Sequence, residues 1–183
     1  MLESVIRDGI AQTSRDDAPR LCPIAIQAPV TPGDLTFELR QLGPTDTAVL
    51  DRVADGVFDG PVVPALLAEF LSDRRHHLIV ALSEGVVVGM ITAVDYVHPD
   101  KPAQLWINEV GVAPGHQRRG IGRALLRAMC EYGRSRGWTE AWLGTEEENA
   151  AARGLYDGTG GVAEPFVLYT FDLRRGTTAK DGS

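Results

Sequence analysis

The sequence predicts an α/β or α+β fold in which a mixed sheet is flanked by helices. Apolar segments rich in β-branched residues alternate along the chain with segments of helical period, in the order β-α-α-β-β-β-α-β-α-β. The 183 residues are 44% hydrophobic and 23% charged, which is typical of a globular protein with a sizeable core. This length indicates one ordinary domain.

The first three predicted elements are a strand and two helices. Residues 35–42 (LTFELRQL) alternate apolar and polar side chains, as a half-buried strand does. Residues 44–53 are predicted to form a helix with Pro44 near its first turn, where proline is tolerated. Residues 64–71 are predicted to form a second short helix, because four large apolar residues fall on one side of it: Leu66, Leu67, Phe70 and Leu71.

A hairpin and a further strand are expected next. Residues 77–82 (HLIVAL) and 86–94 (VVVGMITAV) are apolar and rich in β-branched side chains, and only the tripeptide Ser83-Glu84-Gly85 separates them. This pattern predicts two antiparallel strands joined by a tight turn. Residues 105–112 (LWINEVGV) have the same character and predict another strand.

The longest predicted helix covers residues 120–136. Apolar residues recur from Ile121 at the spacing of one helix face, and Gly137 follows as a stop signal. Three shorter elements complete the series, namely a strand at 138–143, a helix at 149–157 and a final strand at 166–173 (FVLYTFDL).

The domain itself is predicted to cover residues 34–175. Residues 1–33 mix charges, prolines and polar residues without a sustained period, so we expect a flexible or partly ordered extension. Residues 176–183 are expected to be a flexible tail. The first residues lack the unbroken apolar run of a signal peptide, and no apolar stretch reaches the length of a membrane span. These features predict a cytoplasmic protein.

Charge and composition exclude several partners. The net charge of −7 and the pI of about 5.1 argue against nucleic acid or an anionic membrane, because both attract positively charged proteins. The four histidines show no paired ligand spacing and the two cysteines form no CxxC motif, so no metal site is expected. Cys22 and Cys130 stand far apart in unlike segments, so no structural disulfide is expected either.

The stretch GHQRRGIGRALL at 115–126 predicts an anion site where a strand leads into a helix. A helix N-terminus offers unpaired backbone N–H groups and the positive end of the helix dipole. Glycines let the backbone approach an anion closely, and arginine is the preferred planar partner of phosphate oxygens. The alternative is an ordinary glycine-rich connection with solvated arginines.

Two known phosphate motifs do not fit this turn. Ile121 and Gly122 stand where a nucleotide-triphosphatase loop has Lys and Ser or Thr. A dinucleotide-binding fingerprint needs a third glycine after Gly120-Ile121-Gly122, and Leu125 stands there instead.

Two spaced motifs resemble the GNAT superfamily of acyl-CoA N-acetyltransferases. Residues 117–122 (QRRGIG) match its Q/R-x-x-G-x-G/A signature directly after a strand, and residues 149–156 (NAAARGLY) resemble its N-x-x-A-x-x-L-Y helix. Gly160 matches a family glycine, whereas Gly161 replaces the aromatic residue that usually follows. The resemblance covers roughly residues 34–175 and implies a mixed, mostly antiparallel twisted sheet flanked by helices, with acetyl-CoA as the cofactor.

The resemblance also implies where coenzyme A would be held. The turn residues would bind its pyrophosphate, the preceding strand would pair with its pantetheine arm, and the later helix would help hold it. The residues concerned are Gln117, Arg118, Arg119, Gly120, Ile121 and Gly122 in the turn, Val110, Gly111 and Val112 in the strand, and Asn149 and Ala152 at the helix.

Two residues are the candidate catalysts. Tyr156 matches the family tyrosine that donates a proton to the departing sulfur, and a phenol is protonated at neutral pH. Glu109 interrupts an apolar strand, where its carboxylate could take a proton from the amine directly or through water. The alternatives are a core tyrosine and a glutamate that merely faces solvent.

The acceptor is expected to be a small cationic amine. Carboxylates around the site would attract it, and the candidate acceptor residues are Asp95, Tyr96, Glu109, Glu146 and Glu147. Residues 107–126, the hairpin and the ending FVLYTFDL look like the aminoglycoside 3-N-acetyltransferase branch of the superfamily, which implies an antibiotic as acceptor. Another small amine, a protein N-terminus or lysine, and a non-catalytic acyl-CoA-binding module are the alternatives. A homodimer is a further expectation.

Overall fold

The computed structural model describes residues 36–173, and the predicted extension at 1–33 and tail at 176–183 lie outside them. The chain divides into two compact units, Met1–Gly144 and Thr145–Ser183. Each unit is therefore described by itself.

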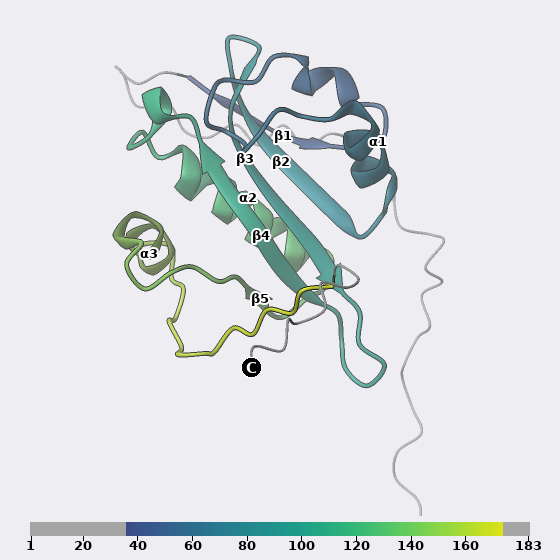
Figure 1. The fold of residues 1–183 in the computed structure, drawn as a ribbon, viewed down its shortest axis with the longest axis vertical. Coiled ribbons are helices and arrows are strands. Elements are labelled where there is room, and N and C mark those ends of the chain that lie inside the picture. Colours follow the sequence, from purple (N-terminus) through teal and green to yellow (C-terminus); the bar gives the residue numbers. More distant parts are fainter. Residues whose placement is uncertain (1–35, 174–183) are drawn as a thin grey trace, which may run out of the picture. The chain divides into compact units, whose positions relative to one another are not determined.

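A five-stranded sheet forms the centre of the first unit (Figure 1). Its strands are β1 (Glu38–Leu42), β2 (His76–Ser83), β3 (Val86–Tyr96), β4 (Gln104–Val112) and β5 (Ala141–Trp142), and they lie in the order β1-β2-β3-β4-β5. The first three pairings are antiparallel and the pairing of β4 with β5 is parallel. The predicted mixed, mostly antiparallel sheet is confirmed.

The predicted hairpin is formed by β2 and β3. Its two turn residues, Glu84 and Gly85, have φ values of 52° and 73°. Two consecutive positive φ angles are typical of the turn whose twist matches that of the flanking strands. The hairpin is thus closed by the short turn that the sequence predicted.

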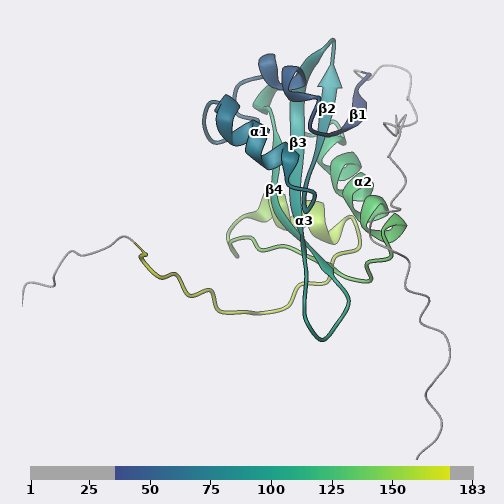
Figure 2. The ribbon, with the colours of Figure 1, turned by 90° about the vertical axis from the view of Figure 1, so that its right-hand side faces the viewer.

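Helices cover both faces of the sheet. α1 (Pro64–Ser72) lies on one face and α2 (Ile121–Ser135) on the other (Figure 2). Both helices were predicted, and α2 ends just before Gly137, which has a φ of 79°. A left-handed residue at this point is a common helix terminator, and glycine adopts it without strain.

The predicted helix at 44–53 is wrong in type and length. The segment holds only the short 3-10 helix η2 (Thr47–Asp51). Before it, the carboxylate of Asp46 accepts a hydrogen bond from the backbone N–H of Gly43 and fixes a turn. After it, Arg52 and Ala54 exchange backbone hydrogen bonds with Val87 of β3, which draws the chain away from a helical path.

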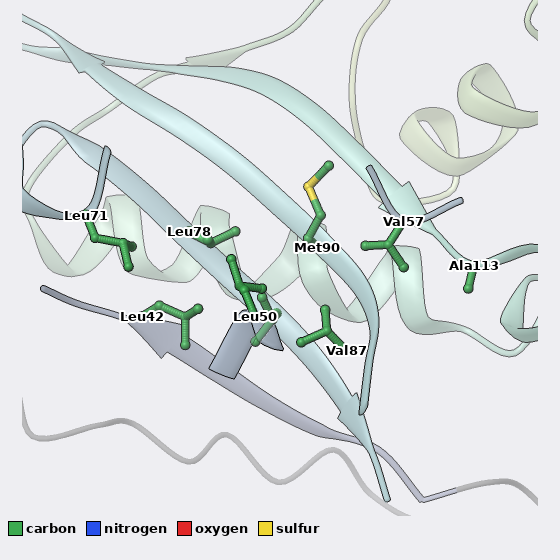
Figure 3. Packing of buried hydrophobic residues seen from close by; sticks show 9 residues of the cluster. Leu42, Leu50, Val57, Leu71, Leu78, Val87, Met90 and Ala113 are labelled. Atoms are coloured by element: carbon green, nitrogen blue, oxygen red, sulfur yellow. The ribbon is translucent and has the colours of Figure 1, made fainter. Parts of the chain in front are cut away.

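Two apolar clusters hold the first unit together. On the α1 face the buried cluster consists of Leu42, Leu50, Val57, Leu71, Leu78, Val80, Val87, Met90 and Ala113 (Figure 3). On the other face α2 buries one side of its length, namely Ile121, Leu125, Leu126, Ala128, Met129, Tyr132 and Gly133. The sheet is therefore packed on both faces, which fixes the direction in which each strand residue points.

In the second unit, α3 (Ala150–Asp157) confirms the predicted helix, but the predicted strand at 166–173 is wrong. Residues 161–173 have no regular secondary structure, and the large apolar side chains among 166–173 are 62% to 91% exposed. Alternating apolar residues supply one face for a strand, but a strand also needs a neighbouring backbone to pair with. Within this unit α3 is the only regular element among the described residues, and it offers no such backbone.

α2 packs closely on the sheet at Gly89 of β3. A Cβ at this position would lie 2.9 Å from Cγ2 of Ile121 and 3.2 Å from Cδ1 of Leu125. Gly89→Ala is expected to lower the free energy of unfolding by about 1–3 kcal/mol, because both helix side chains must move. Urea unfolding measures the change.

Gly60→Ala is the matched control, since a Cβ there meets no atom within 4 Å and its φ is not positive. Equal effects of the two substitutions would show that α2 does not pack on Gly89 as described.

Candidate active site

A β-bulge in β4 decides how Glu109 is presented. Thr92 of β3 is paired with Glu109, whereas the next residue, Ala93, is paired with Ile107. Asn108 is therefore an extra residue in β4. An insertion of this kind bends the strand, changes which face the following side chains occupy, and is common beside active sites.

Glu109 and Gly111 lie on the face of the sheet opposite α2. A Cβ on Gly111 would lie 3.2 Å from Cε of Met90, which belongs to the α1-side cluster. By contrast, Leu105 earlier in β4 lies toward α2, since its Cδ2 is 3.5 Å from the Cβ position of Gly133. The bulge between these positions leaves Glu109 exposed on the α1 face.

A loop from the α1 side contacts β4 next to Glu109. A Cβ on Gly111 would lie only 2.1 Å from the carbonyl oxygen of Val57, so no side chain fits there. The loop turns at Gly56, which has a φ of 75°, and Asp59 follows two residues after Val57. The absence of a side chain at Gly111 thus lets this loop approach the strand that carries Glu109.

The surroundings raise the pKa of Glu109 above its ordinary value. Partial burial of the carboxyl is the larger cause, and the nearby negative charge of Asp59 adds to it. Burial and a like charge both disfavour the ionised form. A carboxylate with a raised pKa binds a proton more strongly, which suits a general base that works near neutral pH.

Asp59 was absent from the sequence prediction. It is 50 residues from Glu109 along the chain and lies in the segment DGVFDG, which reads as an ordinary polar turn. Only the packing of that loop on Gly111 relates the two carboxylates.

The glycine-arginine turn leads from β4 into α2. A short 3-10 helix, η3 (Pro114–His116), follows the strand, and the side-chain amide of Gln117 donates a hydrogen bond of 3.1 Å to the carbonyl of Val112. Arg118 has a φ of 63° and Gly120 has a φ of 82°. A positive φ at a non-glycine residue such as Arg118 carries strain, and strained residues of this kind cluster at functional sites.

This turn fits a pyrophosphate. Gln117, Arg118, Arg119 and Gly120 are exposed, and a Cβ at Gly120 would meet no atom within 4 Å, so the backbone is open to a ligand. Ile121 and Gly122 begin α2, whose first N–H groups have no partner within the helix. Successive backbone N–H groups near left-handed residues, together with the helix dipole and two arginines, favour the binding of an anion. The residues present therefore suit the diphosphate of coenzyme A.

In the second unit, Asn149 is the N-cap of α3. Its Oδ1 accepts a hydrogen bond of 3.1 Å from the backbone N–H of Ala152. This contact satisfies one of the unpaired donors of the helix start. The asparagine of the motif therefore has a structural role in this unit, and its side-chain N–H₂ group remains a donor.

Tyr156 lies half-buried on α3 with a raised pKa. Burial is the larger cause and the charge of Glu146 adds to it. The phenol is thus fully protonated at neutral pH, as a proton donor must be. The backbone N–H of Gly161 donates to the Tyr156 carbonyl at 3.0 Å, and a Cβ at 161 would lie 3.1 Å from that oxygen. The glycine that departs from the family pattern thus permits a tight turn after α3.

The two glutamates predicted to bind the acceptor, Glu146 and Glu147, are exposed just before α3. Arg153 of the helix donates a hydrogen bond of 3.1 Å to the carbonyl of Glu147, which holds this turn against the helix. Both residues are therefore in contact with solvent.

Asp95 and Glu109 lie on opposite faces of the sheet. Asp95 is paired with Leu105 in the ladder, on the α2 side, and its carboxylate lies 3.0 Å from Nε2 of the buried His77. His77 in turn packs against the ring of Tyr132 in α2. Asp95 was predicted to approach the acceptor from a loop after the hairpin, whereas it lies within β3. The structure instead gives Asp95 a partner inside the α2-side packing.

The match of sequence to family extends beyond the two motifs. The acetyltransferase (GNAT) family matches residues 49–160, more than half of the chain. The chain belongs to this family. Enzymes of the family use acetyl-CoA, and the turn described above suits its diphosphate.

Two curated relatives illustrate the range of the family. N-acetyltransferase family 8 member 3 of Mus musculus is 32% identical over 109 residues, which are 58% of this chain and 48% of the mouse protein. N-alpha-acetyltransferase RimI of Mycobacterium tuberculosis is 32% identical over 104 residues, which are 57% of this chain and 63% of that protein. The chain thus spans between about half and two thirds of the length of these relatives.

Solved structures share the fold. An aminoglycoside acetyltransferase, HMB0005, from an uncultured soil metagenomic sample has a TM-score of 0.66 and 22% identity, covering 76% of this chain and 99% of that one. The aminoglycoside N-acetyltransferase AAC(6')-Iy, solved in complex with CoA, has a TM-score of 0.62 and 20% identity over 79% of this chain and all of that one. At this level of identity the likeness concerns the fold.

Residues 36–173 contain no helix long and apolar enough to cross a membrane, and no group of three or more His, Cys, Asp or Glu side chains that could hold a metal ion.

The electrostatic relation between Asp59 and Glu109 is directly testable. Asp59→Asn removes the like charge and is expected to lower the pKa of Glu109 toward its ordinary value, since the ionised carboxylate is then less disfavoured. A carboxyl-detected NMR titration of Glu109 measures the shift.

Asp55→Asn is the matched control, because it makes the same change in the same loop and Asp55 does not contribute to the shift at Glu109. An unchanged Glu109 titration in Asp59→Asn would contradict the described approach of the loop.

Proposed function

We propose that this protein transfers the acetyl group of acetyl-CoA to a primary amine of an aminoglycoside, by direct attack in a ternary complex, with the 3-amino group as the expected position. The observation that carries the proposal is Glu109. It is an exposed carboxylate of raised pKa at a β-bulge, and its strand runs directly into the glycine-arginine turn. Acyl transfer from coenzyme A to an amine requires such a base at the thioester end of the pantetheine arm, and the strand that carries Glu109 would hold this arm.

The residues of the turn and of the strand before it would hold the donor. The backbone N–H groups of Gly120, Ile121 and Gly122, with the side chains of Arg118 and Arg119, would bind the diphosphate. The backbone of Val110, Gly111 and Val112 would pair with the pantetheine arm, and Asn149 and Ala152 would contribute from α3. When bound, acetyl-CoA supplies an acetyl group activated as a thioester.

Glu109 and Tyr156 would move the protons. Glu109 accepts a proton from the acceptor ammonium, directly or through one water, and leaves a nucleophilic amine. Tyr156 donates the proton of its phenol to the departing sulfur, so that the thiol leaves neutral. The raised pKa values of both groups suit these roles, because a carboxylate of raised pKa is a stronger base and a phenol of raised pKa remains protonated at neutral pH.

Charge supports a polycationic acceptor. Glu109 and Asp59 in the first unit, and Glu146 and Glu147 in the second, are carboxylates on a chain of net charge −7. A net negative charge attracts a cationic substrate and raises its rate of association. The aminoglycoside acetyltransferases among the structures of the same fold are consistent with this acceptor class.

A protein N-terminus is the second candidate acceptor. It is favoured by the 32% identity to the N-alpha-acetyltransferase RimI. A peptide acceptor carries one ammonium next to amide groups, whereas an aminoglycoside carries several ammonium groups on sugar rings. A non-catalytic acyl-CoA-binding module is the remaining alternative, and it predicts binding of coenzyme A without turnover.

A thiol-release assay with acetyl-CoA decides among these functions. The acceptors are a panel of aminoglycosides, polyamines and N-terminal peptides. Turnover with an aminoglycoside is the expected result, and acetylation at the 3-amino group is identified by mass spectrometry and NMR of the product. Turnover with peptides alone would replace the aminoglycoside proposal by N-alpha acetylation. Binding of coenzyme A with no turnover on any acceptor would replace it by the binding module.

Glu109→Gln tests the base. The variant keeps size and hydrogen bonding but removes the proton acceptor, so kcat is expected to fall by about a hundredfold to ten-thousandfold. In the unchanged protein kcat/KM should fall as the pH drops below the raised pKa of Glu109, and this acidic limb should disappear in the variant. Glu38→Gln, a change of the same kind on the outer strand β1, is the control. A pH profile that is unchanged in Glu109→Gln removes this residue from the mechanism.

A further inference from the structure

Two tryptophans lie side by side at the end of the sheet near the candidate base. Trp106 of β4 is the register partner of Trp142 of β5, and their ring centroids are 3.6 Å apart with an angle of 79° between the planes. Trp142 is nevertheless 43% exposed and Trp106 is half-buried. Contiguous apolar side chains exposed on a protein surface mark binding sites for a ligand or partner.

Trp106 lies on the same face of the sheet as Glu109. Residues 106 and 109 are three apart, so a regular strand would place them on opposite faces. The bulge at Asn108 removes this difference. Trp106 is paired with Val94 and Glu109 with Thr92, and these two β3 residues are two apart and share a face.

A third aromatic side chain continues this face. Tyr96 follows Val94 by two residues in β3 and is 53% exposed. We call Tyr96, Trp106 and Trp142 the aromatic platform. Carboxylates adjoin it on the same face, since Glu109 follows Trp106 on β4 and the charge of Asp59 acts on Glu109. All of these residues belong to the first unit.

The combination indicates the chemistry of the occupant. Aromatic faces attract cations and pack against the C–H faces of rings, and a carboxylate pairs with ammonium groups. A linear polyamine would use the carboxylates but has no ring to lay on the platform. An acidic or neutral apolar partner would leave Glu109 and Asp59 without a counter-charge.

We infer that the aromatic platform is the acceptor-recognition surface, on which a ring-bearing polycationic amine lies with one ammonium group at Glu109. This inference rests on the proposed function and adds Trp142 as the principal specificity residue. Trp142 acts by binding, so its loss weakens the acceptor and leaves the acetyl donor unaffected.

Fluorescence provides a readout that does not depend on turnover. The chain has three tryptophans, and the third, Trp138, lies on the other side of the sheet against His77 and Tyr132. In a Trp138→Phe protein all tryptophan emission therefore comes from the platform. Titration with the aminoglycoside sisomicin, without acetyl-CoA, is expected to change this emission in a saturable way. Spermine at equal charge concentration is expected to bind more weakly.

Substitution of Trp142 then tests the platform. Trp142→Ala is expected to weaken sisomicin binding and raise its KM by about threefold to thirtyfold, with the KM of acetyl-CoA unchanged. Trp142→Phe keeps an aromatic face and should recover most of the affinity. Thermal unfolding of both variants shows whether the fold is intact, and Trp138→Phe alone should leave both KM values unchanged.

The outcomes separate this inference from the proposed function. Saturable sisomicin binding that Trp142→Ala weakens supports the platform, even if no thiol is released. Thiol release with an unchanged sisomicin KM in Trp142→Ala overturns the platform and leaves the function standing. Tryptophan emission that does not change with sisomicin also overturns the platform as an acceptor surface. Two further measurements then identify what covers the aromatic platform instead. A red shift of the tryptophan emission in Phe171→Ser would identify residues 166–173 as the occupant. A shift of the emission with protein concentration would identify a second copy of the chain.

Discussion

The β-bulge at Asn108 is the constraint on which the candidate site depends. One extra residue in β4 moves Glu109 from the face that α2 covers to the face that it leaves open. Because of this bulge, Trp106 and Glu109 lie on the same face of the sheet, while Leu105 and Ile107 remain buried on the α2 side. Bulges cost ladder hydrogen bonds, and here the irregularity brings chemically useful side chains to one surface.

Two glycines on neighbouring strands fix the layers around that bulge. Gly89 admits α2 on one face, and Gly111 admits the carbonyl of Val57 on the other. The first contact anchors the start of α2, which follows the glycine-arginine turn. The second contact brings the loop that carries Asp59 to β4. The glycine-arginine turn and the two carboxylates therefore depend on close packing at these glycines, and each would be displaced by a side chain added there.

In the first unit, the carboxylates on the two faces of the sheet have different surroundings. On the α2 side, Asp95 lies 3.0 Å from Nε2 of His77, whose ring packs against Tyr132, so this carboxylate serves the packing of the sheet on the helix. On the opposite side, Glu109 has a like-charged neighbour in Asp59. Unbalanced negative charge beside exposed aromatic rings favours a cationic ligand. The same strand pair thus contributes one carboxylate to stability and one to the proposed chemistry.

The sequence by itself determined the five strands of the sheet, the helices α1, α2 and α3, the hairpin turn and the glycine-rich connection from β4 to α2, because each depends on local periodicity or on glycine at a left-handed position. The strand at 166–173 and the helix at 44–53 failed for one reason. Local pattern states what a segment can form, and the available backbone partners decide what it does form. Tertiary structure alone decided the face of each β4 side chain, the separation of Asp95 from Glu109, the approach of Asp59 and the pairing of Trp106 with Trp142. These features depend on strand register and on contacts between residues far apart in the chain. A single inserted residue changes the face on which each following side chain of a strand lies.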